Sequence, residues 1–356
     1  MNPLTVGIIA NPASGKDIRR LVAYGTVFDN QEKISMLRRM LLALLAGGIH
    51  RAIYMPDYQG LMPRALDGLG SEFSLDDGLL TAKGQGGPGL RVEPIDMTVT
   101  ATQADTKLAA SLMAQAGANC LLVLGGDGTS RQAGQGATDT PIIPVSTGTN
   151  NVFPYLMEAT AAGLAAAVVA SGRAGPDAVF RAKKLTVRVN GEPADQAMVD
   201  AAISRQVWVG SRAVWKPSDL AEAYFTRGEP WNLGLASIVG LTDPIGPKDP
   251  YGAYVIFSET ERTLMAPIAP GRIKSIGIGQ SGRLYPGQPK ETIEGPLTVA
   301  LDGERELEIK KSDRVAIELD LNGPLVVDPR EALAGAARDK FFVDRVLVER
   351  LVPTTE

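Results

Sequence analysis

Three short polar loops carry the residue types that phosphate chemistry requires, and the most informative is Gly125-Gly126-Asp127-Gly128-Thr129. It follows the apolar run Leu121–Leu124, which has the length of a buried strand. Ligands of open α/β sheets bind beyond the C-terminal ends of the strands. Glycines without a Cβ let phosphate groups approach backbone N–H groups closely. The segment therefore predicts a phosphate site with the Asp127 carboxylate at its centre.

Two further loops follow expected strands in the same way. The loop from Asn11 to Lys16 offers a phosphate a hydroxyl, an amide and a positive charge, from Ser14, Gly15 and Lys16. The loop from Ser146 to Asn151 follows the expected strand Pro141–Val145. If the preceding strands are neighbours in one parallel sheet, the three loops converge at one edge.

The same residues argue against several familiar sites. The Gly-Lys pair is followed by Asp17 and lacks the earlier glycine of a Walker A loop, and Arg131 occupies the last glycine position of a GxGxxG fingerprint. The chain has a single histidine, His50, and a single cysteine, Cys120. A zinc site is therefore not expected, and any metal should be a hard cation held by carboxylates and phosphates.

Composition narrows the class of protein. The 356 residues suggest about two domains, and 44% hydrophobic and 21% charged residues are ordinary for a globular enzyme. A net charge of −4 and 5% aromatic residues predict no nucleic-acid binding. No run reaches about 18 apolar residues and no signal peptide is recognisable, so we expect a cytoplasmic protein without stable membrane association.

The first half alternates strands and helices, which predicts an α/β domain with a parallel sheet and right-handed crossovers. A helix with apolar residues from Ile34 to Leu45 should be capped by Asp29 or Asn30 and end at Gly47-Gly48. The Gly- and Asp-rich stretch Ser74–Gly89 is expected to be a mobile loop. Strands are expected at Leu4–Ala10, Ala52–Met55, Val92–Asp96, the run into Gly125, and Pro141–Val145.

From about Lys184 the apolar residues alternate with a period of two, and Asn190-Gly191 is a strong hairpin signal. This half should be antiparallel β, either a sandwich or stacked sheets. We expect an α/β phosphate-binding domain over residues 1–175, a β-sandwich domain over 176–325, and a C-terminal segment, 326–356, that packs back on the first domain.

Together the loops resemble a known superfamily. The order Asn-Pro-x-Ser-Gly, then Gly-Gly-Asp-Gly-Thr, then Gly-Thr-x-Asn is similar to the NAD kinase and diacylglycerol kinase-like superfamily. The element Leu301-Asp302-Gly303-Glu304 continues this resemblance. The stretches Val27–Lys33 and Asn150–Pro154 resemble its ATP-NAD kinase-like branch, which includes acetoin catabolism protein X-like members.

The resemblance implies an NAD kinase-like fold with a cleft between the two domains, ATP as phosphoryl donor, and Mg²⁺. It implies that Asp127 orients or deprotonates the acceptor hydroxyl, and that Asp302 and Glu304 hold the metal. The nucleotide- and phosphate-binding residues would be Asn11, Ser14, Gly15, Lys16, Gly125, Gly126, Gly128, Thr129, Arg131, Thr147, Gly148, Thr149, Asn150 and Asn151.

The leading functional hypothesis is an ATP-dependent kinase that phosphorylates the 2′-hydroxyl of NAD to give NADP. Two alternatives stay open: a kinase of another hydroxyl, lipid or polyol, and a nucleotide-binding accessory protein of acetoin catabolism without kinase activity. The expected partners are small molecules, ATP and NAD, together with further copies of the chain in a homo-oligomer. The sequence does not separate ATP from polyphosphate as donor.

Overall fold

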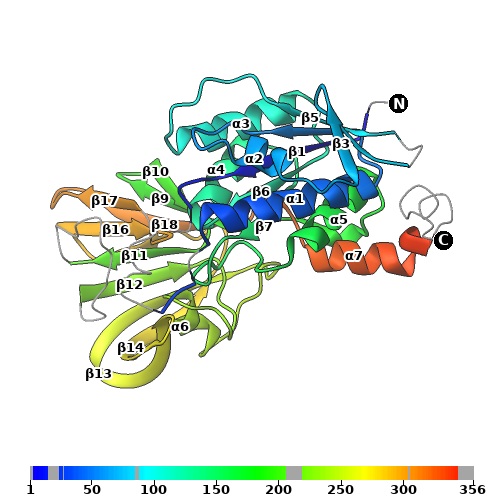
Figure 1. Cartoon of the computed structure of the whole chain (residues 1–356). Helices are drawn as coiled ribbons and strands as arrows, with labels where there is room; N and C mark the ends of the chain where they lie inside the picture. The colour runs from blue at the N-terminus through cyan, green and yellow to red at the C-terminus, as the bar shows by residue number, and fades with distance from the viewer. Residues whose placement is uncertain are drawn as a thin grey trace.

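Figure 1 shows an α/β half that carries the N-terminus beside a half made mostly of strands. The computed structural model describes residues 3–14, 24–26, 28–84, 88–205, 219–303 and 305–343. Within these ranges, every helix is too short or too polar to cross a membrane.

The α/β half is built on a nine-stranded sheet in the order β3-β4-β5-β2-β1-β6-β7-β19-β8. The strands from β5 to β19 run parallel, as the strand–helix alternation predicts. They are β1 (Thr5–Ala10), β2 (Arg51–Tyr54), β5 (Leu90–Pro94), β6 (Cys120–Gly125), β7 (Ile142–Ser146) and β19 (Leu325–Val327). The antiparallel strands are β3 (Phe73–Asp76), β4 (Leu79–Ala82) and β8 (Val179–Arg181).

Helices cover both faces of this sheet, which is why its central strands are apolar throughout. The neighbouring residues Ile8 and Ile9 of β1 enter different hydrophobic cores, one on each face. One face carries α1 (Asn30–Ala46), α2 (Leu61–Asp67), α5 (Ala159–Ala170) and α7 (Pro329–Arg338). The other carries α3 (Ala104–Gln115) and α4 (Asp127–Ala137).

Helix α1 begins where its capping residues predict. The Asp29 carboxylate accepts the backbone N–H of Glu32 at 2.8 Å, which satisfies one of the free donors of the first turn. The helix ends at Gly47, and Gly48 has a φ of 72°. The predicted helix boundaries are confirmed.

The first part of the stretch from Ser74 to Gly89 is not the mobile loop that its composition suggested, and residues 85–87 lie outside the described residues. This part contributes to the β3–β4 hairpin, whose turn residues Asp77 and Gly78 have φ angles of 44° and 74°. An Asp-Gly pair with two positive φ angles favours a tight hairpin turn. The loop prediction was wrong for these residues because Asp77 and Gly78 form a tight turn between two short strands.

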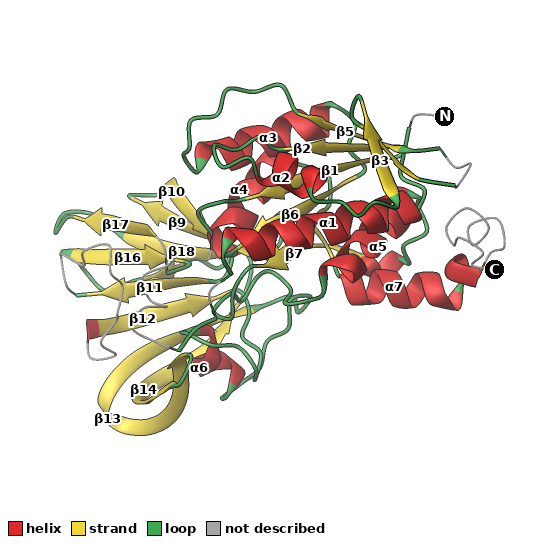
Figure 2. Cartoon of the chain, viewed as in Figure 1, coloured by secondary structure: helices red, strands yellow, loops and turns green. Residues whose placement is uncertain are grey.

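The second half contains two antiparallel sheets, as predicted (Figure 2). One, in the order β10-β9-β18-β15, consists of β10 (Glu192–Ala197), β9 (Lys184–Val189), β18 (Val315–Asp320) and β15 (Lys290–Glu291). The other, in the order β14-β13-β12-β11-β16-β17, consists of β14 (Arg272–Leu284), β13 (Gly252–Ala269), β12 (Leu220–Phe225), β11 (Asp200–Ser204), β16 (Leu297–Leu301) and β17 (Arg305–Ile309).

Apolar side chains from both sheets form one core between them. The outer face of the six-stranded sheet is covered by the short helix α6 (Ala236–Gly240). The turn at Asn190-Gly191 joins β9 to β10 with φ angles of 53° and 87°, which confirms the predicted hairpin.

The chain enters and leaves the β-rich half through the nine-stranded sheet. Strand β8 lies before the β-rich half and β19 after it, and the two pair antiparallel at the edge of the sheet. Helix α7 then packs against α5. The two halves are thus joined by two chain crossings.

Candidate active site

Asp127 lies at the start of helix α4, directly beyond the end of β6. Gly126 is the N-cap residue and Asp127 the first residue of the helix. Gly125 must lack a Cβ, because a Cβ there would lie 2.5 Å from the Thr129 side chain. The glycine-rich segment is therefore the end of a strand and the first helical turn. A carboxylate at a helix N-terminus is stabilised by the helix dipole.

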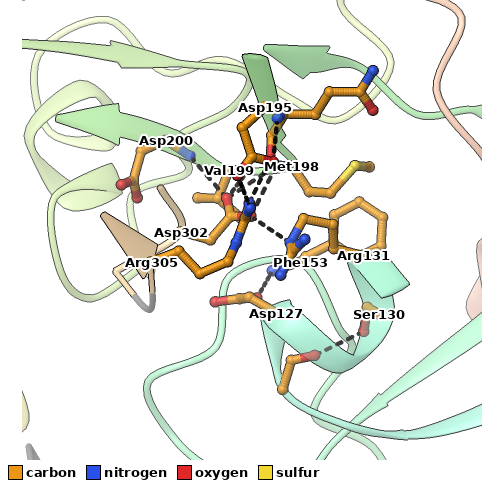
Figure 3. A network of polar contacts seen from close by, with 12 residues as sticks. Asp127, Ser130, Arg131, Phe153, Asp195, Met198, Val199, Asp200, Asp302 and Arg305 are labelled. Carbon is orange, nitrogen blue, oxygen red and sulfur yellow. Dashed lines mark hydrogen bonds and ion pairs between the residues drawn. The ribbon is translucent and has the colours of Figure 1, made fainter. Parts of the chain in front are cut away.

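Two backbone amides fix the Asp127 carboxylate. Oδ1 accepts the N–H of Phe153 at 2.8 Å and that of Val152 at 3.1 Å (Figure 3). Both donors belong to the loop after β7, and the Asp127 side chain is buried. The second and third phosphate loops of the sequence therefore meet at this carboxylate.

The first loop, Asn11 to Lys16, is linked to the second and third loops by two side-chain hydrogen bonds. Asn11 Nδ2 donates to Thr129 Oγ1 at 2.9 Å, and Thr147 Oγ1 donates to Ser14 Oγ at 3.1 Å. The three loops follow β1, β6 and β7, which are adjacent in the sheet. Their expected convergence at one edge is observed. Gly15 and Lys16 lie outside the described residues.

Lys33 of α1 binds the backbone of the first loop. Its side chain is fully buried, and Nζ donates to the backbone oxygens of Asn11 at 3.0 Å and of Ser14 at 2.5 Å. It also donates to Pro12 O and to the Asn30 side chain. A lysine in the first turns of a helix is usually solvated, so the sequence around Lys33 does not predict that it binds the first loop.

The third loop is ordered by its own polar side chains. Asn151 Nδ2 donates to Ser146 Oγ at 2.7 Å, and Ser146 Oγ donates to the carbonyl of Gly148. Thr149 Oγ1 accepts the N–H of Thr26. The buried Asn150 Oδ1 has no hydrogen-bond partner among the described residues. One acceptor thus remains available beside the loop that holds Asp127.

Arg131, one turn after Asp127, contacts Asp302 of the other half. Arg131 Nε lies 3.6 Å from Asp302 Oδ2, and both side chains are at most 2% exposed. Asp302 also accepts backbone N–H groups from Met198 at 3.0 Å and Val199 at 2.8 Å. Burial raises the pKa of the Asp302 carboxyl, against the opposing effects of these amides and of the arginine charge.

These contacts bear on the expected metal site. The amide hydrogen bonds and Arg131 occupy the Asp302 carboxylate, and Glu304 lies outside the described residues. In the described part of the chain, no three His, Cys, Asp or Glu residues are grouped to hold a metal. The contacts of Asp302 fit a cross-link between the halves better than a metal ligand.

Sequence reasoning missed Arg227, which follows β12. Its guanidinium lies 4.7 Å from the centre of the Phe153 ring, and only 3% of the residue is exposed. Burial lowers the pKa of Arg227, while the charges of Glu229 and Asp127 and the nearby Tyr155 oppose that shift. A positive charge from the β-rich half therefore lies beside Asp127, on the ring of the residue that donates to it.

Comparisons with known proteins agree with this architecture. Residues 6–174 match the family model of the ATP-NAD kinase N-terminal domain, and residues 183–322 that of the Acetoin catabolism protein X C-terminal domain. Acetoin catabolism protein X of Cupriavidus necator is 37% identical over 341 residues, which cover 94% of this chain and 92% of the relative. The chain belongs to the acetoin catabolism protein X family.

Two solved structures show how this family member compares in fold. Yeast NADH kinase complexed with NADH has 14% identity and a TM-score of 0.50, over 97% of this chain and 89% of that one. A diacylglycerol kinase from Bacillus anthracis str. Sterne has 15% identity and a TM-score of 0.41, over 92% of this chain and 97% of that one. The first likeness concerns the fold alone. The predicted family resemblance and the predicted fold class are both confirmed.

Proposed function

We propose that this protein is an ATP-dependent kinase that transfers the γ-phosphoryl group of ATP to the 2′-hydroxyl of NAD. One observation carries the proposal: the Asp127 carboxylate is buried and fixed by two amides where three phosphate-type loops meet. The match of residues 6–174 to an ATP-NAD kinase domain supports the donor and the acceptor. The name of the Cupriavidus relative supports a role within acetoin catabolism.

The proposed step needs little covalent chemistry from the protein. Phosphoryl transfer depends on alignment and on electrostatic stabilisation of charge. An Asp127 oxygen accepts the proton as the acceptor O–H bond breaks, the hydroxyl oxygen bonds to the γ-phosphorus, and ADP leaves with the bridging oxygen. The amides of Val152 and Phe153 hold the carboxylate in one orientation for this purpose. The donor phosphates would lie against the loops of Ser14 and Thr147 and the start of α4, where backbone N–H groups favour anions.

The test is NADP formation from ATP, Mg²⁺ and NAD, measured by a coupled dehydrogenase assay. Asp127→Asn should lower turnover by roughly 10²- to 10⁴-fold, the usual contribution of a positioned general base. Asp139→Asn is the matched control, because Asp139 follows the end of the same helix, with its side chain 82% exposed. Asp139→Asn should retain wild-type turnover.

Other outcomes would decide between this function and its alternatives. If the protein transfers phosphate from ATP to a lipid or polyol but not to NAD, it is a kinase of another hydroxyl acceptor. Tight binding of ATP or NAD without phosphoryl transfer to any acceptor would favour an accessory role. Equal activity in the wild type and Asp127→Asn would remove Asp127 from the chemistry.

A further inference from the structure

The segment that carries Arg227 is anchored firmly in the β-rich half. Thr226 donates its backbone N–H to Val199 O at 2.9 Å and its hydroxyl to Met198 O at 2.7 Å. Met198 and Val199 are the residues whose amides bind Asp302. The position of Arg227 is therefore fixed by the same strand ends that join the two halves.

Phe153 brings the arginine charge to Asp127. The Phe153 ring lies under the guanidinium at 4.7 Å, while its backbone N–H donates to the Asp127 carboxylate at 2.8 Å. A planar guanidinium stacks well on an aromatic face and keeps its edge free for hydrogen bonds. One residue thus orients both the carboxylate of the α/β half and the cation of the β-rich half.

Arg227 carries a charge and is almost fully buried, yet one of its buried nitrogens is not satisfied by the described residues. Its buried Nε has no hydrogen-bond partner among them, and none of their carboxylates forms an ion pair with it. The Tyr155 hydroxyl, whose pKa Arg227 influences electrostatically, is likewise buried without a partner in the described part of the chain. Unsatisfied buried polar groups are costly and rare, so two neighbouring ones indicate a ligand.

The chemistry of that ligand follows from the group that binds it. The guanidinium edge matches a phosphate, which it can bind through two parallel hydrogen bonds. Glu229 and Asp127 act on Arg227 electrostatically. Their negative charges would repel an anion at this position if Arg227 did not bind it. The donor phosphates are proposed to lie on loops of the α/β half, whereas Arg227 reaches Asp127 from the opposite half.

We propose that Arg227 binds a phosphate group of the phosphoryl acceptor and thereby selects a phosphate-bearing acceptor over a neutral alcohol or lipid. The acceptor role rests on the proposed kinase function, and the anion site itself does not.

The experiment measures dissociation constants by calorimetry for three probes: ADP-ribose, which carries a diphosphate, adenosine, which does not, and ATP. The variants are Arg227→Met, Arg227→Lys and the control Arg283→Met. Arg283 also lies over an aromatic ring, at 4.2 Å from the centre of Tyr251, but it is partly exposed and pairs with Asp243. Melting curves establish that each variant is folded.

Arg227→Met should raise the dissociation constant of ADP-ribose by about 10- to 100-fold, the usual value of a charged hydrogen-bonded pair. Adenosine and ATP should change by less than about threefold. Arg227→Lys should recover part of the loss because it keeps the charge without the planar edge. Arg283→Met should bind all three probes like the wild type.

Three results would overturn the inference: no binding of ADP-ribose by the wild type, an unchanged dissociation constant in Arg227→Met, or weakening confined to ATP. Failure of the kinase proposal gives a different result. If ADP-ribose binding depends on Arg227 but no NADP forms, the anion site is supported and the NAD kinase function is refuted. If NADP forms while Arg227→Met binds ADP-ribose normally, the NAD kinase function is supported and the anion site is refuted.

Discussion

In the α/β half, backbone amides fix the Asp127 carboxylate, whereas the β-rich half contributes the charged side chains of Arg227 and Asp302. Around Asp127, the amides of Val152 and Phe153 and the first turn of α4 define the geometry. From the other half come Arg227 and Asp302, each buried and each anchored near Met198 and Val199. Under the proposed function, the first half would fix where phosphoryl transfer occurs and the second half would select the acceptor.

The largest stability effect should come from breaking the contact between the halves. Arg131→Met removes one partner of a buried ion pair and leaves the buried Asp302 carboxylate without the arginine charge that faces it. The free energy of unfolding should fall by about 4 kcal/mol. Arg188→Met is the control, because its pair with Glu318 is partly exposed, and it should cost about 1 kcal/mol or less. Urea unfolding measures both. Equal losses would mean that the Arg131 contact is not a special link between the halves.

A smaller effect should come from the lysine beneath the first loop. Lys33→Met removes the lysine donor from the carbonyls of Asn11, Pro12 and Ser14, at a cost of about 3 kcal/mol. Methionine is as good a helix former as lysine, so α1 itself is not weakened. ATP binding should weaken as well. Lys107→Met on the exposed face of α3 should change stability by less than about 0.5 kcal/mol. If the two variants are equally stable, Lys33 does not support the loop.

The smallest effect is a pH dependence that belongs to the β-rich half. Lys183 is 3% exposed, donates to the carbonyls of Gly246 and Tyr251, and has its pKa lowered to about 7, first by burial and then by Arg227. Above pH 7 the unfolded chain still binds the proton that the folded chain has lost, so this group's contribution to stability rises with pH until the usual pKa of 10.5.

The stability difference between the wild type and Lys183→Met should therefore shift by about 2 kcal/mol in favour of the wild type from pH 7 to pH 9. Denaturant unfolding at a series of pH values measures it. A constant difference across this range would show that the Lys183 pKa is not lowered.

The sequence predicted what local patterns encode. The apolar run into Gly125 predicted that Asp127 follows the end of a strand, and Asn190-Gly191 predicted a hairpin turn. Both predictions were possible because these features depend on residues that are neighbours in the sequence. The Asp77-Gly78 turn carried the same kind of signal and was overlooked. The convergence of three loops could be predicted because parallel strands end at one edge of a sheet.

The parts that escaped prediction depend on contacts between distant segments. Lys33 looks like a solvated helix residue, and only the path of the first loop makes it a buried donor. Arg227 is 74 residues from Phe153 in the sequence, and its role arises from the packing of one half on the other. Asp302 stays a predicted metal ligand, and the sequence did not indicate that its oxygens accept amide N–H groups from Met198 and Val199, between β10 and β11.

The central claim is that Asp127 directs the γ-phosphoryl group of ATP onto a hydroxyl of NAD. Phosphorus NMR of a mixture of protein, ATP, Mg²⁺ and NAD follows that group directly. The wild type should convert the γ-phosphate signal into the 2′-phosphate monoester signal of NADP while ADP accumulates, and Asp127→Asn should not. Release of inorganic phosphate alone, or an equal monoester signal from both proteins, would contradict the claim.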